Sequence, residues 1–439
     1  MDVVLIGFGV LLACIFLRMP IAFAMGAVGF CGLWYIRGWV PALASSAERF
    51  ISSVQNYELA VLPMFILMGN LVARAGFSHE LYASAQTFLG HRRGGLAMAT
   101  VVACGGFAAI CGSSLATAAT MSKVALPSMR AFGYKDTLAT ASIAAGGTLG
   151  IMIPPSTIMV IYGLMTETSI NQLFAAGFLP GFIGVLLYMG AIQWSVWRDP
   201  AAGPAAERAP WPVRFKALKS VWGVLFLFVL VIGGIYAGAF TANEAAGIGA
   251  GGALLLALVK RVPFKALLDV FIDSARTSAI LFFVLIGALI FSNFINVAGF
   301  PEALKGYVTG TGLSPQLVIL LILGIYIILG CILESLSMIL LTVPIFFPLV
   351  QTLAPGLGID PKWILVWFGI IIVMVTEISL ITPPVGLNVY VLSGVVPGLK
   401  TTTVFRGMMP FISADFVRLA AITYIPIISL VLPRLFYGK

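Results

Sequence analysis

Charged residues are scarce in this chain, and their scarcity excludes a soluble protein. Of the 439 residues, 9% are Asp, Glu, Lys or Arg and 60% are apolar. Soluble domains carry roughly 25% charged residues, which cover their surface toward water. The 47 glycines and 24 prolines do not indicate disorder either, because disordered chains are polar. Transmembrane helices tolerate both residues. The composition therefore predicts an all-α, multi-pass membrane protein embedded in a lipid bilayer.

Histidine and cysteine are too few or too scattered for most catalytic and metal chemistry. The only histidines, His79 and His91, fall in a predicted loop, and the five cysteines lie in apolar runs without CxxC spacing. A disulfide framework or a zinc site is therefore not expected. The sequence has no GxxxxGK[ST] stretch and no HExxH, so we expect no ATP-driven motor and no enzyme. The formal charge of +9 indicates cytoplasmic loops rather than a nucleic-acid partner.

Apolar runs of about 20 residues mark candidate membrane spans. They lie near residues 2–17, 20–36, 57–74, 136–166, 171–195, 220–240, 244–259, 276–297, 362–396 and 409–433. Two more apolar stretches, 94–130 and 315–350, are interrupted at Cys111-Gly112-Ser113-Ser114 and at Gly330-Cys331-Ile332-Leu333-Glu334-Ser335. We predict that these two are re-entrant helical hairpins. Most of the 25 Lys and Arg residues fall in loops that become cytoplasmic if the N-terminus lies outside.

The order of these features repeats in the two halves of the chain. Residues 1–196 hold a hairpin (94–130) and a broken span (136–166), and residues 220–439 hold the same pair at 315–350 and 362–396. Residues 197–219 are rich in Ala and Pro at their start and charged, which is typical of a cytoplasmic linker. About five spans plus a hairpin per half would invert the second half relative to the first. Inverted repeats with broken helices are the architecture of secondary transporters.

The breaks supply groups that bind ions. The double prolines Pro154-Pro155 and Pro383-Pro384 lack N–H groups, and in a helix they leave the carbonyls of Gly150, Ile151, Ser379 and Leu380 without donors. Such oxygens are hard ligands for a small cation, and half-helices that begin at the breaks direct N–H groups toward an anion. Proline kinks also occur in ordinary helix packing. Their recurrence in both halves favours two cation sites and one anion site.

Two acidic residues stand inside the predicted membrane region. Glu334 is in the second hairpin break, and Glu377 precedes the second double proline. Each could hold a cation, take a proton or brace a loop by accepting backbone N–H bonds. Glu244, in contrast, forms Thr241-x-x-Glu244, a predicted capping box at the start of a span.

Three stretches carry a resemblance to a known family. They are GSSLATAATMSKVALPSMRAFGY (112–134), GGTLGIMIPPSTIMVIYG (146–163) and EISLITPPVGLNVYVL (377–392). The chain resembles, over essentially its whole length, the large membrane subunit of tripartite ATP-independent periplasmic (TRAP) transporters, the DctM-like proteins. One departure is Thr241-Ala-Asn-Glu244, where the family usually has TPTE.

The resemblance implies a sodium-driven elevator-type importer in the bacterial inner membrane. In that picture the hairpins and broken spans move, and the other spans form a scaffold. The implied partners are a small four-span membrane subunit and a periplasmic substrate-binding protein. The implied substrate is a small organic anion, such as a C4-dicarboxylate or a sialic acid, and Na⁺ is the coupling ion.

The resemblance also implies site residues, and no catalytic ones. One sodium site is expected from Ser113, Ser114, Gly150 and Ile153, and the other from Gly330, Glu334, Ser379 and Thr382. The expected substrate contacts are Ser113, Ser114, Thr117, Pro154, Ser156, Pro383, Gly386 and Asn388. A proton-coupled carrier of similar architecture, with Glu334 and Glu377 as relays, is the main alternative. An ion channel is a further one, which flux without saturation would identify.

Overall fold

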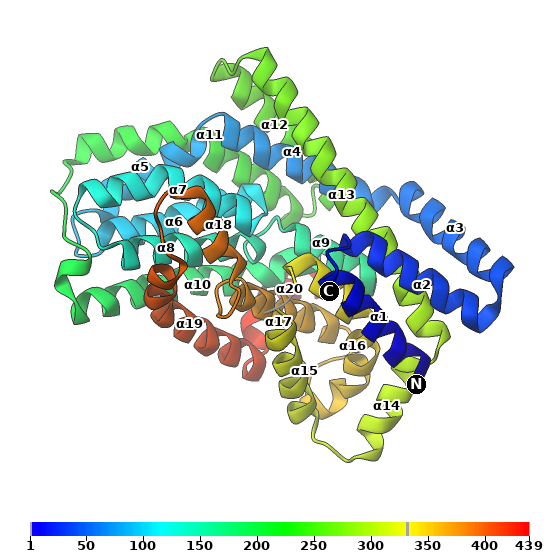
Figure 1. Ribbon diagram of the computed structural model, residues 1–439. Helices are drawn as coiled ribbons and strands as arrows, with labels where there is room; N and C mark the ends of the chain where they lie inside the picture. The colour runs from blue at the N-terminus through cyan, green and yellow to red at the C-terminus, as the bar shows by residue number, and fades with distance from the viewer. Residues whose placement is uncertain (1, 331–332, 439) are drawn as a thin grey trace.

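The computed structural model describes residues 2–330 and 333–438, and within them it contains helices but no β-strand (Figure 1). The first half contains α1 (Asp2–Phe16), α2 (Ile21–Arg37), α3 (Trp39–Gln55), η1 (Tyr57–Ala60), α4 (Val61–Arg74), α5 (Phe77–Leu89), α6 (Gly95–Cys111), α7 (Ser114–Ala131), α8 (Asp136–Thr148), η2 (Leu149–Ile151), α9 (Thr157–Thr166) and α10 (Ile170–Arg198). The second half contains η3 (Pro200–Ala202), α11 (Trp211–Tyr236), α12 (Ala242–Val259), α13 (Phe264–Val297), α14 (Phe300–Gly310), α15 (Pro315–Gly330), α16 (Ser335–Leu357), α17 (Ile364–Ser379), α18 (Leu387–Val395), α19 (Thr401–Tyr424) and α20 (Ile427–Tyr437).

Fewer uninterrupted spans occur than the ten apolar runs indicate. In the described ranges six helices are long and apolar enough to cross a membrane, and the pair α19 and α20, bent by 55°, makes a seventh. The two double-proline runs are each split into shorter helices, and α1 and α2 have only 15 and 17 residues. The predicted membrane protein is confirmed, while the inverted relation between its halves stays a prediction.

Both hairpin segments consist of two helices that meet at the predicted break. In the first, α6 ends at Cys111 and α7 begins at Ser114, with Gly112 at φ 62° between them. Because a side chain is strained at this positive φ, glycine suits the turn. In the second, α15 ends at Gly330 and α16 begins at Ser335. Cys331 and Ile332, part of the predicted second break, lie outside the described residues.

The broken spans occupy the interior. α17 is buried almost along its whole length, and it packs against α15, α16, α19, α10 and α9. α8 is likewise buried beyond its first turn, between α6, α7 and α19. A helix that is apolar on every side is a core helix. The first parts of both broken spans, α8 and α17, are therefore enclosed by protein, whereas Pro383 and Pro384 at the second break are exposed.

α1, α2, α3 and the C-terminal part of α13 form a separate side of the molecule (Figure 1). α2 packs closely on α13 because glycine faces the contact: a Cβ at Gly29 would lie 2.7 Å from the Phe291 backbone. α13 begins at Phe264, twelve residues before the predicted span, and its polar first turns account for the difference.

The linker is shorter than the predicted segment 197–219. α10 continues to Arg198 and α11 begins at Trp211, because proline at the second position of a helix costs no hydrogen bond. The connection between them is bound to the loops beside the first hairpin. Gly94 N–H donates to the Gly203 carbonyl (2.8 Å), Lys135 N–H to Ala202 (3.1 Å) and Ala206 N–H to Gly90 (2.9 Å).

Candidate functional site

Four helices begin at one cavity. It has a volume of about 270 Å³, and its lining includes Ser114, Thr157, Ser335 and Leu387, the first residues of α7, α9, α16 and α18. Each helix starts at one of the predicted breaks, so all four breaks meet at this cavity. A helix N-terminus carries a partial positive charge and unpaired N–H groups, and both favour an anion.

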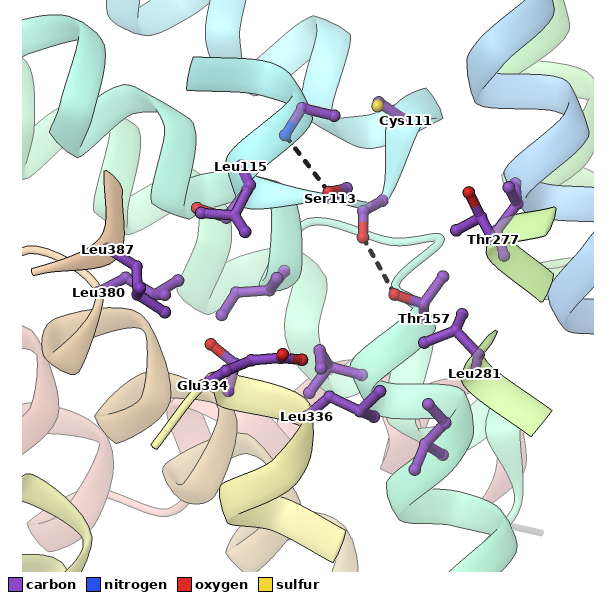
Figure 2. A pocket seen from close by; sticks show the side chains of 18 of the residues that line it. Cys111, Ser113, Leu115, Thr157, Thr277, Leu281, Glu334, Leu336, Leu380 and Leu387 are labelled. Carbon is purple, nitrogen blue, oxygen red and sulfur yellow. Dashed lines mark hydrogen bonds between the residues drawn. The ribbon is translucent and has the colours of Figure 1, made fainter. Parts of the chain in front are cut away.

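The cavity has a largely apolar lining with a few hydroxyl groups, one amide and one carboxylate, and no Lys or Arg among the described residues lines it. Ser113 and Thr157 lie on one side and Glu334 on the opposite side, while Thr277 and Leu281 of α13 close a third (Figure 2). The complete lining is Ile66, Asn70, Cys111, Gly112, Ser113, Ser114, Leu115, Ala116, Ile151, Thr157, Ile158, Ile161, Thr277, Leu281, Glu334, Ser335, Leu336, Leu380 and Leu387. An anion here would meet hydroxyl groups and helix N-termini rather than Lys or Arg.

Local hydrogen bonds fix the first break. Ser113 caps α7, because its Oγ accepts from the Ala116 N–H at 3.4 Å, and Thr157 Oγ1 donates to the Gly112 carbonyl at 3.2 Å (Figure 2). A Cβ at Gly150 would lie 3.0 Å from the Ser113 carbonyl oxygen. The first hairpin break therefore contacts the first broken span, and three of the four residues of the first expected sodium set lie at this contact: Ser113, Ser114 and Gly150.

The buried amide of Asn388 ties the two halves together at the cavity. Ser114 Oγ lies 2.8 Å from Asn388 Nδ2 and 3.1 Å from Oδ1, and Nδ2 also donates to the Ala144 carbonyl at 2.9 Å. Asn388 is in α18, whereas Ser114 and Ala144 belong to α7 and α8. One side chain of the second broken span thus joins the first hairpin to the first broken span.

At each double proline, one of the two carbonyls that lose their helical donor accepts a hydrogen bond from another group. Ser156 Oγ donates to the Ile151 carbonyl at 2.6 Å, and Asn388 N–H donates to the Leu380 carbonyl at 3.0 Å. The Gly150 and Ser379 carbonyls accept no hydrogen bond from the described residues. The expectation of four orphaned carbonyls is therefore half right. A buried carbonyl without a donor is costly, and a cation can replace the missing donor.

Part of the second expected sodium set also comes together. Gly330 packs so closely on Ser379 that a Cβ at Gly330 would overlap the Ser379 side chain. Glu334 immediately precedes α16 and lines the cavity. Thr382 Oγ1 donates to the Ile378 carbonyl at 2.6 Å. In the described ranges no three His, Cys, Asp or Glu side chains gather, so a cation here would be held mainly by hydroxyl and carbonyl oxygens.

Few of the expected residues line the cavity itself. Ser113, Ser114 and Glu334 do. The remainder lie outside its lining: Thr117, Gly150, Ile153, Pro154, Ser156, Gly330, Ser379, Thr382, Pro383, Gly386 and Asn388. Thr117 and Ser156 use their hydroxyls on backbone carbonyls, those of Ser113 and Ile151.

Sequence reasoning missed Asn70 and Thr277, which line the cavity from α4 and α13. Asn70 Nδ2 donates to Ser274 Oγ at 2.9 Å, so the two helices are joined beside the cavity. Asn70 is a lone amide in the apolar run 57–74, and that rarity was the available signal.

A second omission is a buried charge cluster formed by Glu377, Asp415 and Arg418. Arg418 Nη2 lies 2.8 Å from Glu377 Oε2 and 2.8 Å from Asp415 Oδ1, and all three side chains are at most 1% exposed. Thr148 Oγ1 donates to Glu377 Oε1 at 2.9 Å, and Tyr188 OH donates to Asp415 Oδ2 at 2.7 Å. Glu377 therefore braces the two broken spans against each other. The available signal was the charged pair Asp415 and Arg418 within an apolar run.

Comparison with known proteins gives consistent results. A family model described as "Tripartite ATP-independent periplasmic transporter, DctM component" matches residues 8–428. The chain is 37% identical over 397 residues to the C4-dicarboxylate TRAP transporter large permease protein DctM of Pseudomonas aeruginosa, covering 90% of each chain. It is 30% identical to the sialic acid TRAP transporter large permease protein SiaM of Vibrio cholerae, covering 97% of each. The solved YdaH transporter of Alcanivorax borkumensis has a similar fold, with a TM-score of 0.60 and 16% identity over 91% of this chain and 89% of that one.

Proposed function

The chain belongs to the DctM family of TRAP transporters, and on that premise we propose that it carries a small organic anion across the bacterial inner membrane together with sodium ions. The family consists of transporter subunits and not enzymes, and its members are inner-membrane proteins. The substrate class, the coupling ion and the movement are the proposed parts.

The convergence of four helix N-termini and several hydroxyl groups on one cavity supports the anion. α7, α9, α16 and α18 all begin at its wall. Because the lining has no Lys or Arg, the positive ends of these helices and the Ser and Thr hydroxyls are what attracts a carboxylate. The similarity to C4-dicarboxylate and sialic acid permeases supports a carboxylate substrate.

Glu334 supplies a physical reason for coupling to a cation. Its carboxylate lines the same cavity, so a bound anion faces a negative charge unless a cation lies between or beside them. The carbonyls of Gly150 and Ser379, which accept no hydrogen bond from the described residues, are at the two breaks. We assign one sodium ion to Ser113, Ser114, Gly150 and Ile153 and one to Gly330, Glu334, Ser379 and Thr382, held mostly by oxygens that keep their position only while the breaks are folded.

The movement follows from which elements enclose the cavity. The hairpins and broken spans form most of its wall, and α4 and α13 close it with Asn70, Thr277 and Leu281. Sliding the first group past the second would carry the cavity through the membrane while α8 and α17 stay surrounded by protein. We propose that a small membrane subunit enlarges the static group and that a periplasmic binding protein delivers the anion.

Thermal unfolding of the purified chain with its small subunit tests sodium binding. At equal ionic strength NaCl should raise the unfolding temperature over KCl and choline chloride, because a ligand at 100 times its dissociation constant adds about 2.7 kcal/mol. Ser114→Ala and Thr382→Ala should lose the shift, whereas Ser413→Ala, an exposed serine on α19, should keep it. Equal unfolding temperatures in the three salts would contradict sodium coupling.

The Glu377, Asp415 and Arg418 cluster is the observation that favours the proton-coupled alternative. It contains two buried carboxylates and one guanidinium, so a proton could compensate the second carboxylate. Uptake into proteoliposomes that follows an imposed pH gradient and ignores sodium would favour this alternative. Uptake that needs sodium at constant pH would exclude it.

A further inference from the structure

Arg214 is a buried cation for which the described part of the chain supplies no ion pair and no hydrogen bond to Nε or Nη2. It is the fourth residue of α11, and its residue is 5% exposed. None of the ion pairs among the described residues includes it. Its guanidinium lies 5.0 Å from the Trp211 ring and 5.8 Å from the Phe88 ring. Burying a charge is costly unless an opposite charge or hydrogen bonds compensate it.

The surroundings of Arg214 add positive charge. Burial and the nearby guanidinium groups of Arg214, Arg208 and Arg92 lower the pKa of His91, so the four side chains share one electrostatic environment. Glu207, next to Arg208, makes no ion pair among the described residues. Arg214 also stands in the first turn of α11, where the helix dipole disfavours a cation. A bound anion would reduce each of these unfavourable electrostatic energies.

The cluster is held together by the linker. The backbone bonds from Gly94 to Gly203 and from Ala206 to Gly90 bind residues 199–210 to the loop that carries His91 and Arg92. Arg208 is thereby kept beside that loop. Trp197 near the end of α10 and Trp211 at the start of α11, which stand on either side of the linker in the sequence, are 77% and 58% exposed. Exposed Trp beside basic residues is typical of the level of lipid headgroups.

We propose that Arg214, with Arg208, Arg92 and His91, forms a binding site for a phosphate group at the cytoplasmic end of α11. Guanidinium groups bind phosphate oxygens through paired N–H donors, and Nε and Nη2 of Arg214 are such a pair. The phosphate can belong to the headgroup of an anionic lipid or to a free phosphate ion. This site is independent of the transported anion.

Binding of defined probes to the purified full-length chain in a neutral detergent tests the site. The probes are dioleoylphosphatidylglycerol, dioleoylphosphatidylcholine and inorganic phosphate, followed by native mass spectrometry and by thermal unfolding. We expect phosphatidylglycerol to bind and stabilise the chain, and Arg214→Gln to weaken that binding at least about tenfold, because a charge-assisted hydrogen bond is lost. Lys219→Gln, which removes an exposed charge further along α11, is the matched control.

The three probes identify the source of the phosphate. Protection by phosphatidylglycerol alone identifies a lipid headgroup, and equal protection by inorganic phosphate identifies the free ion. If Arg214→Gln does not fold, Arg208→Gln and Arg92→Gln replace it, because both side chains are exposed. The proposal is overturned if Arg214→Gln, or the pair Arg208→Gln and Arg92→Gln, binds every probe as tightly as the original chain does. It is also overturned if Lys219→Gln weakens binding as much as those variants do.

Discussion

Arg418 is a buried guanidinium held by two carboxylates in the interior of the chain. It faces both Glu377 and Asp415, and no described residue forms a hydrogen bond with its Nε or Nη1. Removing one partner of a buried ion pair typically costs about 3–5 kcal/mol, since the remaining charge is left uncompensated. We expect Arg418→Met to lower the unfolding temperature strongly. Circular dichroism in detergent during heating measures the loss.

Two variants show whether charge is the cause. Arg406→Met removes an exposed arginine from the same helix and should leave the unfolding temperature nearly unchanged. Adding Glu377→Gln and Asp415→Asn to Arg418→Met should restore part of the lost stability. If the triple variant is less stable than Arg418→Met, packing around the guanidinium matters more than its charge.

Asn388 joins the first hairpin to both broken spans, so its replacement should loosen them together. Asn388→Ala leaves Ser114 Oγ and the Ala144 carbonyl without that donor, at a cost of about 1–3 kcal/mol for buried groups. We expect a lower unfolding temperature and slower uptake, with Asn296→Ala on α13 as the exposed control. An unchanged unfolding temperature with a raised KM would instead make Asn388 a substrate contact.

The sequence predicted individual site residues where the same motif occurs in both halves of the chain, and missed them where the motif occurs once. Ser113, Ser114 and Glu334 stand at breaks that occur in both halves, and all three line the cavity. Asp415 and Arg418 lie in an apolar run without a counterpart, and only their shared contact with Glu377 reveals their importance. Long-range pairing of this kind depends on tertiary packing and leaves no local pattern.

At the scale of elements, the contact between α2 and α13 makes a sharp prediction. A Cβ at Gly29 would lie 2.7 Å from the Phe291 backbone, whereas a Cβ at Gly26, one turn earlier, would meet Gly287 Cα at an ordinary 3.7 Å. Gly29→Ala should therefore cost about 1–3 kcal/mol through overpacking. Gly26→Ala should be neutral or stabilise by up to about 1 kcal/mol through helix propensity.

Circular dichroism during heating, applied to Gly29→Ala and Gly26→Ala side by side, measures this difference in stability. An equal loss in both would mean that the helix interior, not the close approach, determines the effect.

The ends of elements were predicted well where glycine, proline or a cap marks them. The capping box of Thr241 and Glu244 begins α12 as expected, and both hairpins break at the predicted residues that the structure describes. α3 and α5 were missed because hydropathy finds apolar runs, and both helices carry many polar residues. α13 extends beyond its predicted span because its first turns hold Lys265, Asp269 and Asp273.

At the scale of the whole molecule, the division into moving and static parts can be tested at Thr277. It lines the cavity from α13, and neither proposed sodium set includes a residue of that helix. Thr277→Trp should fill part of the cavity and reduce uptake at least about tenfold, because extra side-chain volume forced into a packed site costs about 1–3 kcal/mol. The sodium-dependent shift in unfolding temperature should remain.

Two variants serve as controls and should transport normally: Thr277→Ser, and Thr309→Trp at an exposed position of α14. Normal uptake by Thr277→Trp would place the cavity outside the transport path.

The bound linker has a practical consequence for anyone who wishes to label or split this protein. Because the linker is rich in alanine and proline, it looks like a suitable place to insert a fluorescent reporter between the halves. Three backbone hydrogen bonds, however, connect it to the loops beside the first hairpin. An insertion there would pull on α6 and α8 and disturb what it is meant to report. The exposed turn at Gly312, where a Cβ would meet nothing within 4 Å, is the better point of attachment.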